Sequence, residues 1–286
     1  MPNRIKTVTN PKEFFFSENS YPNKSLGQNF IKDLRVIDRI IELAELSSED
    51  EVLEIGPGLG ALTLALTDNA GKVVAIEKDK KLVKHLSESF RDYPSVELVH
   101  QDALKADFSS FYSGKKMKAI SNLPYSVSSP ILFKLLQARE YFSCMVLMLQ
   151  LEVGERITAC PGGKTYGSIS VLLQTFMDIT TEFRVHPASF WPKPKVDSIV
   201  LKLVPLKVPR AAVSDEKLYE KVVRAAFSSR RKMIGNSLQS IMSRDSARES
   251  LELSGIDKTR RAETLTIEEF GILVDKVSLI EKQSMS

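Results

Sequence analysis

One stretch decides the fold of this 286-residue chain, and it is Glu51-Val52-Leu53-Glu54-Ile55-Gly56-Pro57-Gly58-Leu59-Gly60. Its first half is short and largely apolar, which is typical of a buried strand, and its second half is a glycine-rich turn. The apolar residues from Leu62 to Leu66 then indicate a helix. A strand, a glycine loop and a helix in this order form the unit with which open α/β sheets hold phosphates or nucleosides. Glycines suit this task because a backbone without side chains can approach a ligand closely.

The spacing of these glycines restricts the class of ligand that the loop is expected to bind. It is G-x-G-x-G, whereas the dinucleotide-binding pattern is G-x-G-x-x-G, so a ligand with a nucleoside and no pyrophosphate is favoured. The next strand, residues 72–77, ends in Glu77, which lies 17 residues beyond Gly60. A carboxylate at that place can accept hydrogen bonds from both ribose hydroxyls. The alternative is a tight turn without a ligand, and the acid in register with the strand and helix argues against it.

Two further predicted strands, residues 96–100 and 117–121, also end beside polar residues. The first leads to Asp102, which can accept a hydrogen bond from an exocyclic amine or, alternatively, cap a helix. The second delivers Asn122. Because ligands of open α/β sheets bind along the carboxyl edge of the strands, the glycine loop and the three polar residues are expected to converge on one crevice.

The corner after the last of these strands has the sequence Ser121-Asn122-Leu123-Pro124-Tyr125. Proline fixes its own backbone and pushes the preceding residue, Leu123, into an extended conformation. The Asn122 amide and the Leu123 and Pro124 carbonyls can then accept the hydrogens of a planar amino group, while the Tyr125 ring stacks on its base. An adenine offers both features. The alternative is an Asx turn with a packed tyrosine.

Composition restricts the class of protein. Apolar residues make up 43% and charged residues 27%, as in ordinary globular proteins, and the net charge of +4 permits a polyanionic partner. The two cysteines, Cys144 and Cys160, and three scattered histidines have no metal-ligand spacing, so no metal is expected. There is no apolar run of membrane-spanning length and no apolar N-terminal leader. These features favour a cytoplasmic protein.

The remaining chain divides into three parts. Residues 1–22 show no clear period and are expected to form a mobile N-terminal tail. A cofactor-binding catalytic domain is predicted over 23–205, and a helical domain over 206–286 follows a proline-bounded linker. Within these parts, apolar periodicity predicts helices at 34–44, 130–138, 151–159 and 168–176 and strands near 144–149, 180–185 and 197–204.

Four motifs along the chain are specific when they are taken together. They are Gly27-Gln28-Asn29-Phe30, Glu54-Ile55-Gly56-Pro57-Gly58, Asn122-Leu123-Pro124-Tyr125 and Phe190-Trp191-Pro192-Lys193-Pro194-Lys195-Val196-Asp197-Ser198. With them, most of residues 24–240 resembles the class I S-adenosylmethionine-dependent methyltransferases. More narrowly, the chain resembles the family of ribosomal RNA adenine N6,N6-dimethyltransferases that act on small-subunit rRNA.

The resemblance implies a fold and a cofactor. The expected fold is α/β, a Rossmann-like doubly wound sheet of seven mostly parallel strands with a small all-helical C-terminal domain. The expected cofactor is S-adenosyl-L-methionine. The residues expected to bind it are Gln28, Asn29, Ile31, Gly56, Gly58, Glu77, Asp102, Ala103 and Asn122. Asn122, Leu123, Pro124 and Tyr125 are expected to be catalytic. One departure is Ser126, where the family pattern has asparagine, so a polar contact after the motif is either weaker or made by the hydroxyl.

The chemistry implied is mainly positioning. The sulfonium makes the methyl carbon electrophilic, but the adenine N6 lone pair is delocalised and a poor nucleophile. Holding both in line can supply at most about 7–11 kcal/mol of the barrier, without a histidine or cysteine base. The target base must leave its stack to reach the pocket. Tyr125 would then stack on one face, and Phe30 or Phe190 would cover the other.

The segment 221–244 carries six basic side chains and no acids. A run of charge is usually a solvated face, but beside a crevice for an RNA base it favours phosphate contacts with salt-dependent affinity. Lys193 and Lys195 would extend the basic stripe. The residues predicted to bind RNA are therefore Lys193, Lys195, Arg224, Arg230, Arg231 and Lys232.

The predicted function is transfer of methyl groups to N6 of two adjacent adenosines in a hairpin near the 3′ end of 16S rRNA. The partner would be an immature 30S-type subunit, bound by a monomer that also acts in ribosome biogenesis. Three alternatives remain open: a resistance-type methyltransferase of large-subunit rRNA, an assembly factor whose binding matters more than its catalysis, and a DNA adenine methyltransferase.

Overall fold

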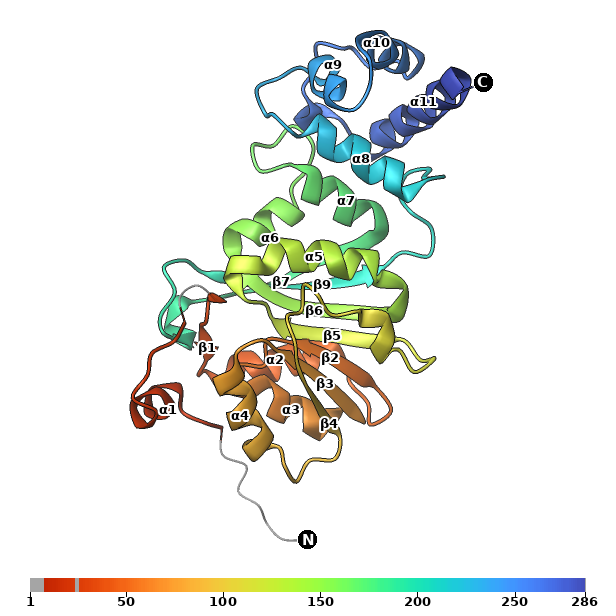
Figure 1. Ribbon diagram of the computed structural model, residues 1–286. Coiled ribbons are helices and arrows are strands. Elements are labelled where there is room, and N and C mark those ends of the chain that lie inside the picture. The colour runs from red at the N-terminus through yellow and green to blue at the C-terminus, as the bar shows by residue number, and fades with distance from the viewer. Residues whose placement is uncertain (1–7, 24–25, 286) are drawn as a thin grey trace. The chain divides into compact units, whose positions relative to one another are not determined.

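A computed structural model describes residues 8–23 and 26–285 (Figure 1). The chain forms two compact units. The sheet unit comprises Met1–Gly154 and Ile179–Pro205, and the helical unit comprises Glu155–Asp178 and Leu206–Ser286. Residues 155–178, expected in the catalytic domain from sequence, group with the helical unit because α7 (Ser168–Phe176) packs on α8 (Glu216–Ala226). There the Thr175 and Tyr219 hydroxyls lie 2.9 Å apart.

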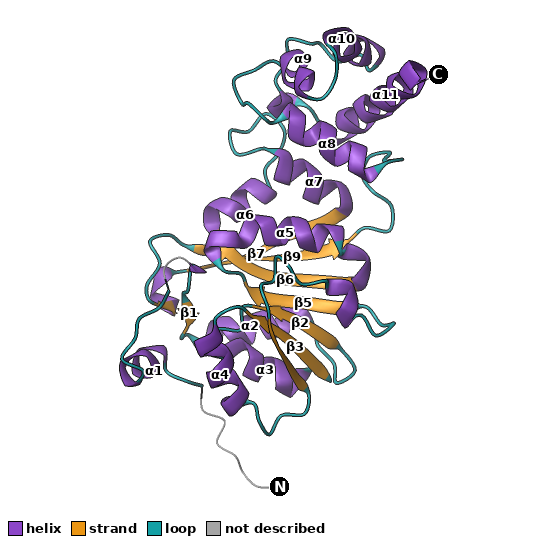
Figure 2. Cartoon of the chain, in the orientation of Figure 1, coloured by secondary structure: helices purple, strands orange, loops and turns teal. Residues whose placement is uncertain are grey.

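In the described part of the chain, seven strands form one sheet in the order β4-β3-β2-β5-β6-β9-β7 (Figure 2). The strands from β4 to β6 run parallel to their neighbours, and β9 is antiparallel to β6. The predicted fold class is confirmed. The strands are β2 (Glu51–Ile55), β3 (Lys72–Glu77), β4 (Val96–His100), β5 (Met117–Asn122), β6 (Phe142–Gln150), β7 (Met177–Val185) and β9 (Ser198–Pro205).

Helices of the sheet unit bury one apolar stripe each. In α2, Val36, Ile37 and Ile40 recur at helical spacing and are buried together with Val73 of β3 and Val146 of β6. Asp33 begins this helix, since its side chain accepts the Arg35 N–H at 3.2 Å. The helices are α1 (Pro11–Ser17), α2 (Leu34–Ala44), α3 (Ala61–Asn69), α4 (Lys80–Ser89) and α5 (Ser128–Gln137).

The N-terminal part differs from the expected mobile tail. Residues 1–7 lie outside the described residues, but α1 is a capped and packed helix. Asn10 accepts the N–H of Lys12 at 3.0 Å, and Pro11 occupies the first turn, where its missing N–H costs nothing. Phe15 is 6% exposed. Three consecutive phenylalanines show no helical period, so the sequence does not indicate which one of them is buried.

A second, two-stranded sheet joins distant parts of the sheet unit. In it β1 (Phe30–Ile31) pairs antiparallel with β8 (Phe190–Trp191), with Phe30 opposite Trp191 and Ile31 opposite Phe190. The pairing brings two of the motifs from the sequence, the loop before residue 30 and the proline-rich loop after residue 190, into direct backbone contact.

The helical unit has its own core. Tyr219 and Val222 of α8 are fully buried, as are Leu238 and Phe270. The helices are the later part of α6 (Leu151–Ile157), then α7, α8, α9 (Ile234–Ser237), α10 (Arg244–Leu253) and α11 (Ile267–Met285). Within residues 8–23 and 26–285, no helix has the length and apolar character needed to span a membrane.

Candidate active site

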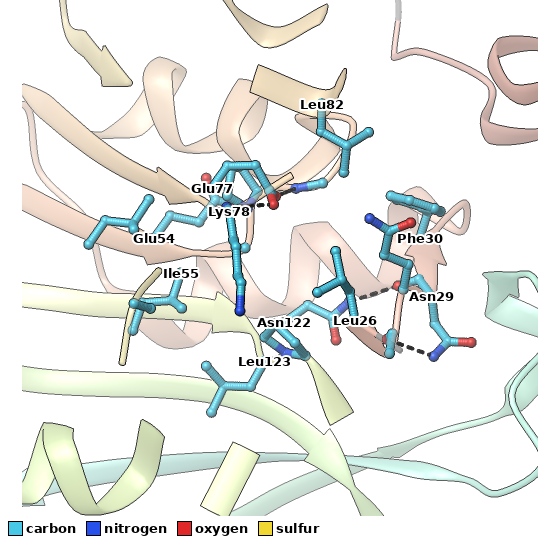
Figure 3. Close-up of a pocket in the computed structure, with 18 of the residues that line it drawn as sticks. Leu26, Asn29, Phe30, Glu54, Ile55, Glu77, Lys78, Leu82, Asn122 and Leu123 are labelled. Atoms are coloured by element: carbon cyan, nitrogen blue, oxygen red, sulfur yellow. Dashed lines mark hydrogen bonds between the residues drawn. The ribbon is translucent and has the colours of Figure 1, made fainter. Parts of the chain in front are cut away.

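The carboxyl ends of four strands meet at one edge of the sheet. Because β2, β3, β4 and β5 are parallel neighbours, the residues that follow Ile55, Glu77, His100 and Asn122 all emerge on the same side. They line one cleft together with the loop at residues 26–31. The convergence predicted from sequence is thus present in the structure (Figure 3).

Two glycines let the loops around the cleft come close. Gly56 has φ +72°, and a Cβ placed on it would lie 3.2 Å from the Pro124 side chain. Gly27 has φ +65°, and its Cβ would lie 2.9 Å from the backbone nitrogen of Ser126. A larger residue would therefore be strained in its backbone and would press on the corner. The glycine loop, the N-terminal loop and the corner with Asn122 are consequently one packed assembly.

Asn122 carries an unsatisfied hydrogen-bond acceptor. Its amide nitrogen Nδ2 donates to the backbone oxygen of Asn29 at 3.1 Å (Figure 3), which fixes the orientation of the amide because that oxygen can only accept. Its oxygen Oδ1 is buried and has no hydrogen-bond partner among the residues that the structure describes. A buried acceptor without a donor costs about 1–3 kcal/mol, so this atom is suited to receive an N–H from a ligand.

The rest of the corner is tied to its surroundings. The Leu123 N–H donates to the Met148 oxygen at 2.9 Å, and the Leu123 side chain is 1% exposed. The Pro124 carbonyl accepts the Val127 N–H at 3.1 Å and retains a second lone pair. The corner can therefore offer its acceptors without rearranging.

Tyr125 stands beside the corner on the cleft wall. Its hydroxyl forms a short hydrogen bond with the Ser198 hydroxyl, at the start of β9. Burial raises the pKa of this phenol, and the hydrogen bond to Ser198 opposes the shift. The Phe190 ring packs against Tyr125, with centroids 6.5 Å apart and ring planes at 68°. The orientation of the Tyr125 ring is thus set by both neighbours.

Glu77 presents a buried carboxyl to the cleft. It is 7% exposed, and Oε1 accepts the N–H groups of Lys78 and Asp79, each at 2.8 Å. Oε2 accepts the Gly58 N–H at 3.3 Å. Burial raises the pKa of Glu77, while these backbone N–H groups oppose the shift. The carboxyl is therefore held rigidly at the place where a ribose is expected.

Asp102 is ion-paired. Its Oδ2 lies 2.8 Å from Nζ of Lys78, and its Oδ1 accepts the Leu104 N–H at 3.0 Å. The Lys78 ammonium, above all, holds the pKa of Asp102 below its usual value. The local structure is an Asx turn and not the helix cap considered as an alternative. Each oxygen keeps a lone pair with which it can accept from a ligand.

Sequence reasoning missed Glu54. It lines the cleft, is 1% exposed, and its Oε2 accepts the Thr63 hydroxyl at 2.6 Å. Burial raises the pKa of Glu54 to about 8, with opposition from Thr63 and reinforcement from the neighbouring charge of Glu77. An acid flanked by apolar residues on both sides, Leu53 and Ile55, was the available signal. Lys78, which follows Glu77 directly, was missed as well.

The predicted cofactor and catalytic residues all lie around this cleft. Gln28 is fixed between the Asn23 N–H, which it accepts at 2.7 Å, and the Asp79 carboxylate, to which it donates at 2.8 Å. Those that line the cleft are Gln28, Asn29, Ile31, Gly56, Gly58, Glu77, Asp102, Ala103, Asn122, Leu123, Pro124 and Tyr125. Their individual roles remain predictions.

The predicted RNA-binding residues are exposed but fall into two groups. Lys193 and Lys195 lie on the loop between β8 and β9 of the sheet unit, and the others belong to the helical unit. Arg224 pairs with Glu220 at 2.7 Å. Arg230 contacts Glu263 at 3.6 Å and the backbone oxygen of Lys164. That the two groups together form one basic stripe stays a prediction.

Comparison with protein families gives a match over nearly the whole chain. The model described as "Ribosomal RNA adenine dimethylase" matches residues 19–278. A relative from Geobacter metallireducens, "Ribosomal RNA small subunit methyltransferase A", is 46% identical over 87% of this chain and 93% of its own length. A protein of the same name from Clostridium botulinum is 46% identical over 94% of this chain and 97% of its own length.

Solved structures agree with this assignment. A dimethyladenosine transferase from Plasmodium falciparum superposes with a TM-score of 0.70, at 28% identity, over 90% of this chain and 98% of its own. The 23S rRNA methyltransferase ErmE gives a TM-score of 0.63 at 27% identity, over 87% of this chain and 99% of its own. The chain therefore belongs to the ribosomal RNA adenine dimethylase family, whose members take their methyl groups from S-adenosylmethionine.

Proposed function

We propose that this enzyme dimethylates N6 of two adjacent adenosines in a hairpin near the 3′ end of 16S rRNA, giving N6,N6-dimethyladenosine. The observation that supports the chemistry is the buried, unpartnered Oδ1 of Asn122 at the cleft. It is an acceptor for an amino hydrogen, and an exocyclic amine of adenine supplies one. The two relatives at 46% identity, both named for the small subunit, favour 16S over 23S rRNA.

The cleft fits S-adenosylmethionine at several points. Glu77 is fixed by three backbone N–H groups and takes the ribose hydroxyls. Asp102 accepts from the adenine amine of the cofactor, and the backbone around Gly56 and Gly58 lies against the nucleoside. When bound, the cofactor supplies a methyl carbon that its sulfonium makes electrophilic. When it is ionised, the buried carboxyl of Glu77 favours such a cationic ligand over an anionic one, whereas Glu54, with a pKa of about 8, is neutral at pH 7.

Asn122 and its neighbours orient the target nitrogen. Oδ1 of Asn122 accepts one N6 hydrogen, and a carbonyl of the corner accepts the other. Acceptors on the hydrogens favour a pyramidal nitrogen, whose lone pair is less delocalised into the ring and points towards the cofactor, and this positioning is the main source of rate enhancement. The methylated nitrogen is cationic after the transfer and loses its proton to water. Because Nδ2 is held by Asn29, the acceptor does not have to rotate during either of the two transfers.

Aromatic rings receive the base outside its stack. Tyr125 covers one face, and its ring is already oriented by Ser198 and Phe190. Of the two candidates for the second face, Phe190 touches Tyr125, whereas Phe30 packs with Phe15 and Leu59. Phe30 lines the cleft, whereas Phe190 is 1% exposed and belongs to the buried core, so Phe30 is the favoured candidate. Unstacking costs a few kcal/mol, which the new stacking offsets.

The exposed cations bind the phosphates that flank the target. Lys193 and Lys195 make these contacts from the sheet unit, and Arg231 and Lys232 make them from the helical unit. We place the protein in the cytoplasm as a monomer that binds an immature 30S-type subunit and assists its biogenesis. Both cysteines are free thiols, which suits a reducing compartment.

One experiment tests class, product and position together. Small subunits that lack the modification are incubated with the protein and labelled S-adenosylmethionine, and the rRNA is digested to nucleosides. We expect N6,N6-dimethyladenosine, and primer extension should stop at two adjacent adenosines near the 3′ end of 16S rRNA. Label found only in 23S rRNA, or only in monomethyladenosine, would contradict the proposal.

A further inference from the structure

The segment Thr9–Ser17 forms part of the wall of the cofactor cleft. Thr9 and Pro11 line the cleft beside the residues that follow the strands. The Asn10 side chain begins α1 between them, and it accepts the N–H groups of Lys12 at 3.0 Å and Glu13 at 3.4 Å. The Asn10 cap therefore fixes the start of the helix at the rim of the cleft.

Phe15 anchors this segment from outside the cleft. Its ring centroid lies 5.4 Å from that of Phe30 and 5.6 Å from that of Trp191, and it shares an apolar cluster with Leu59 and Leu82. Phe30, Leu59 and Leu82 are themselves cleft residues. Phe15 thus packs on the outer side of the side chains whose inner side faces the ligand.

A second anchor joins the segment to α4. Oγ1 of Thr9 lies 3.2 Å from Nε2 of His85, and the Phe14 ring packs on the imidazole with centroids 4.7 Å apart. Helix α4 begins at Lys80, just after Glu77. The segment therefore bridges the wall that carries the ribose acceptor and the wall that carries Phe30. His85, to which the proposed reaction gives no part, serves as its docking point.

We propose that Thr9–Ser17 is a further element of the cofactor site, in which Thr9 and Pro11 contact S-adenosylmethionine and Phe15 is a positioning residue. This inference rests on the cofactor site proposed above. Phe15 holds Phe30 and Leu59 in the conformation that the ligand needs. Without it the cleft samples other conformations, and the apparent affinity falls by the fraction that is no longer competent.

Neighbouring phenylalanines provide a matched test. Phe15 is 6% exposed, whereas Phe16, on the same helix, is 89% exposed. Calorimetric titration with S-adenosylhomocysteine should give a dissociation constant about tenfold higher for Phe15→Ala and an unchanged one for Phe16→Ala. Phe15→Leu should recover part of the loss. In turnover with rRNA, the defect should appear in KM for S-adenosylmethionine and not in kcat.

Thr9→Ala keeps the test decisive if Phe15→Ala does not fold. This substitution removes a hydroxyl and one methyl group, and we expect a dissociation constant about threefold higher with little change in the melting temperature. Equal affinity in wild type, Phe15→Leu and Thr9→Ala, or an equal loss in Phe16→Ala, would overturn the inference while leaving the proposed function intact. If the wild type itself did not bind S-adenosylhomocysteine, the proposed cofactor site would fail, and this inference with it.

Discussion

Two loops of this protein, for which opposite tasks are proposed above, differ in how they are held. The corner Asn122–Tyr125 is held by hydrogen bonds to Met148, Asn29 and Ser198, and its one buried acceptor, Oδ1 of Asn122, has no partner in the described part of the chain. The loop Arg230–Lys232 lies between α8 and α9 with exposed side chains. Among the described residues, no ion pair involves Arg231 or Lys232.

The difference teaches what each ligand requires. Directing one nitrogen lone pair demands fixed atoms, because a displacement of about 1 Å can cost a hundredfold in rate. Attracting a polyphosphate backbone demands only charge near the surface, because the free energy comes from release of counterions. Removal of one atom from the first loop should therefore cause a large loss of methyl transfer, whereas removal of one charge from the second should weaken RNA binding only slightly.

Asn122→Ala should produce the largest effect. We expect methyl transfer to fall by roughly a hundredfold or more, because the acceptor that orients N6 is lost. The affinity for rRNA should be unchanged, since the basic side chains remain. Methylation is measured by label incorporation and affinity by filter binding at the same salt concentration.

Asn122→Asp is the informative control. It keeps an acceptor at Oδ1 but replaces the donor that holds the Asn29 oxygen. Activity between that of wild type and Asn122→Ala would show that acceptor and orientation both matter. If Asn122→Ala retained more than about a third of wild-type activity, the idea of a rigid corner would have to be abandoned.

Glu54 extends the comparison to pH, because no other acid among residues 8–23 and 26–285 is buried as deeply. Its folded pKa of about 8 exceeds the ordinary value of 4.5, so the folded state holds a proton that the unfolded state releases. The stabilisation is complete below about pH 4.5 and is lost as pH rises through about 8. Urea unfolding between pH 5.5 and 9 should show a loss on the order of a few kcal/mol.

Glu54→Gln should remove most of this pH dependence, since the amide still accepts from Thr63 and cannot ionise. The control is Glu42→Gln, the same substitution at an exposed position, in which the fall in stability with pH should remain. An equally steep fall in stability in Glu54→Gln would mean that another group is responsible.

The basic loop should respond more gently. Arg231→Gln and Lys232→Gln should each weaken rRNA binding a few-fold at physiological salt and lower the slope of log affinity against log salt by about one. The maximal rate with saturating rRNA should stay the same. Lys116→Gln is the control, because this exposed lysine precedes β5 and so lies at the opposite end of that strand from Asn122. An equal change in slope for Lys116→Gln would show that charge anywhere on the surface suffices.

Tyr125→Phe should give the smallest effect. It removes the hydroxyl that bonds to Ser198 but keeps the ring, so we expect a change in kcat of about twofold. Tyr125→Ala also removes the ring and should lower activity by a further factor of about ten or more. Single-turnover kinetics on the two variants separate the anchor from the stacking surface. Equal losses in both would assign the function to the hydroxyl and count against stacking.

The sheet was predictable because its signals are local. Glycines at 56, 58 and 60 follow an apolar strand, and Glu77 and Asn122 each end another, so topology alone brings them to one edge. What could not be predicted depends on tertiary packing. Nothing in Phe14-Phe15-Phe16 tells which ring is buried, and that choice is made by Phe30 and Trp191, which are distant in sequence.

The prediction of the domain boundaries was limited in the same way, because they too depend on tertiary packing. The helix at residues 168–176 was predicted by its periodicity, but periodicity does not say which core it joins. Its Thr175 and Phe176 pack with Tyr219, and this places the helix with the later part of the chain. Glu54 was overlooked for a related reason, since only the neighbouring strands show that its carboxyl faces a cleft.

The pairing of β1 with β8 has a consequence for the order in which the molecule is made. A ribosome releases Phe30 long before Trp191, yet the strands that contain these residues pair only with each other in this small sheet. Contacts between residues so far apart in sequence form slowly, because a long loop must close first. During synthesis, the methyl-transfer pocket therefore remains unfinished until most of the sheet unit has emerged, and a nascent chain should not yet retain the cofactor.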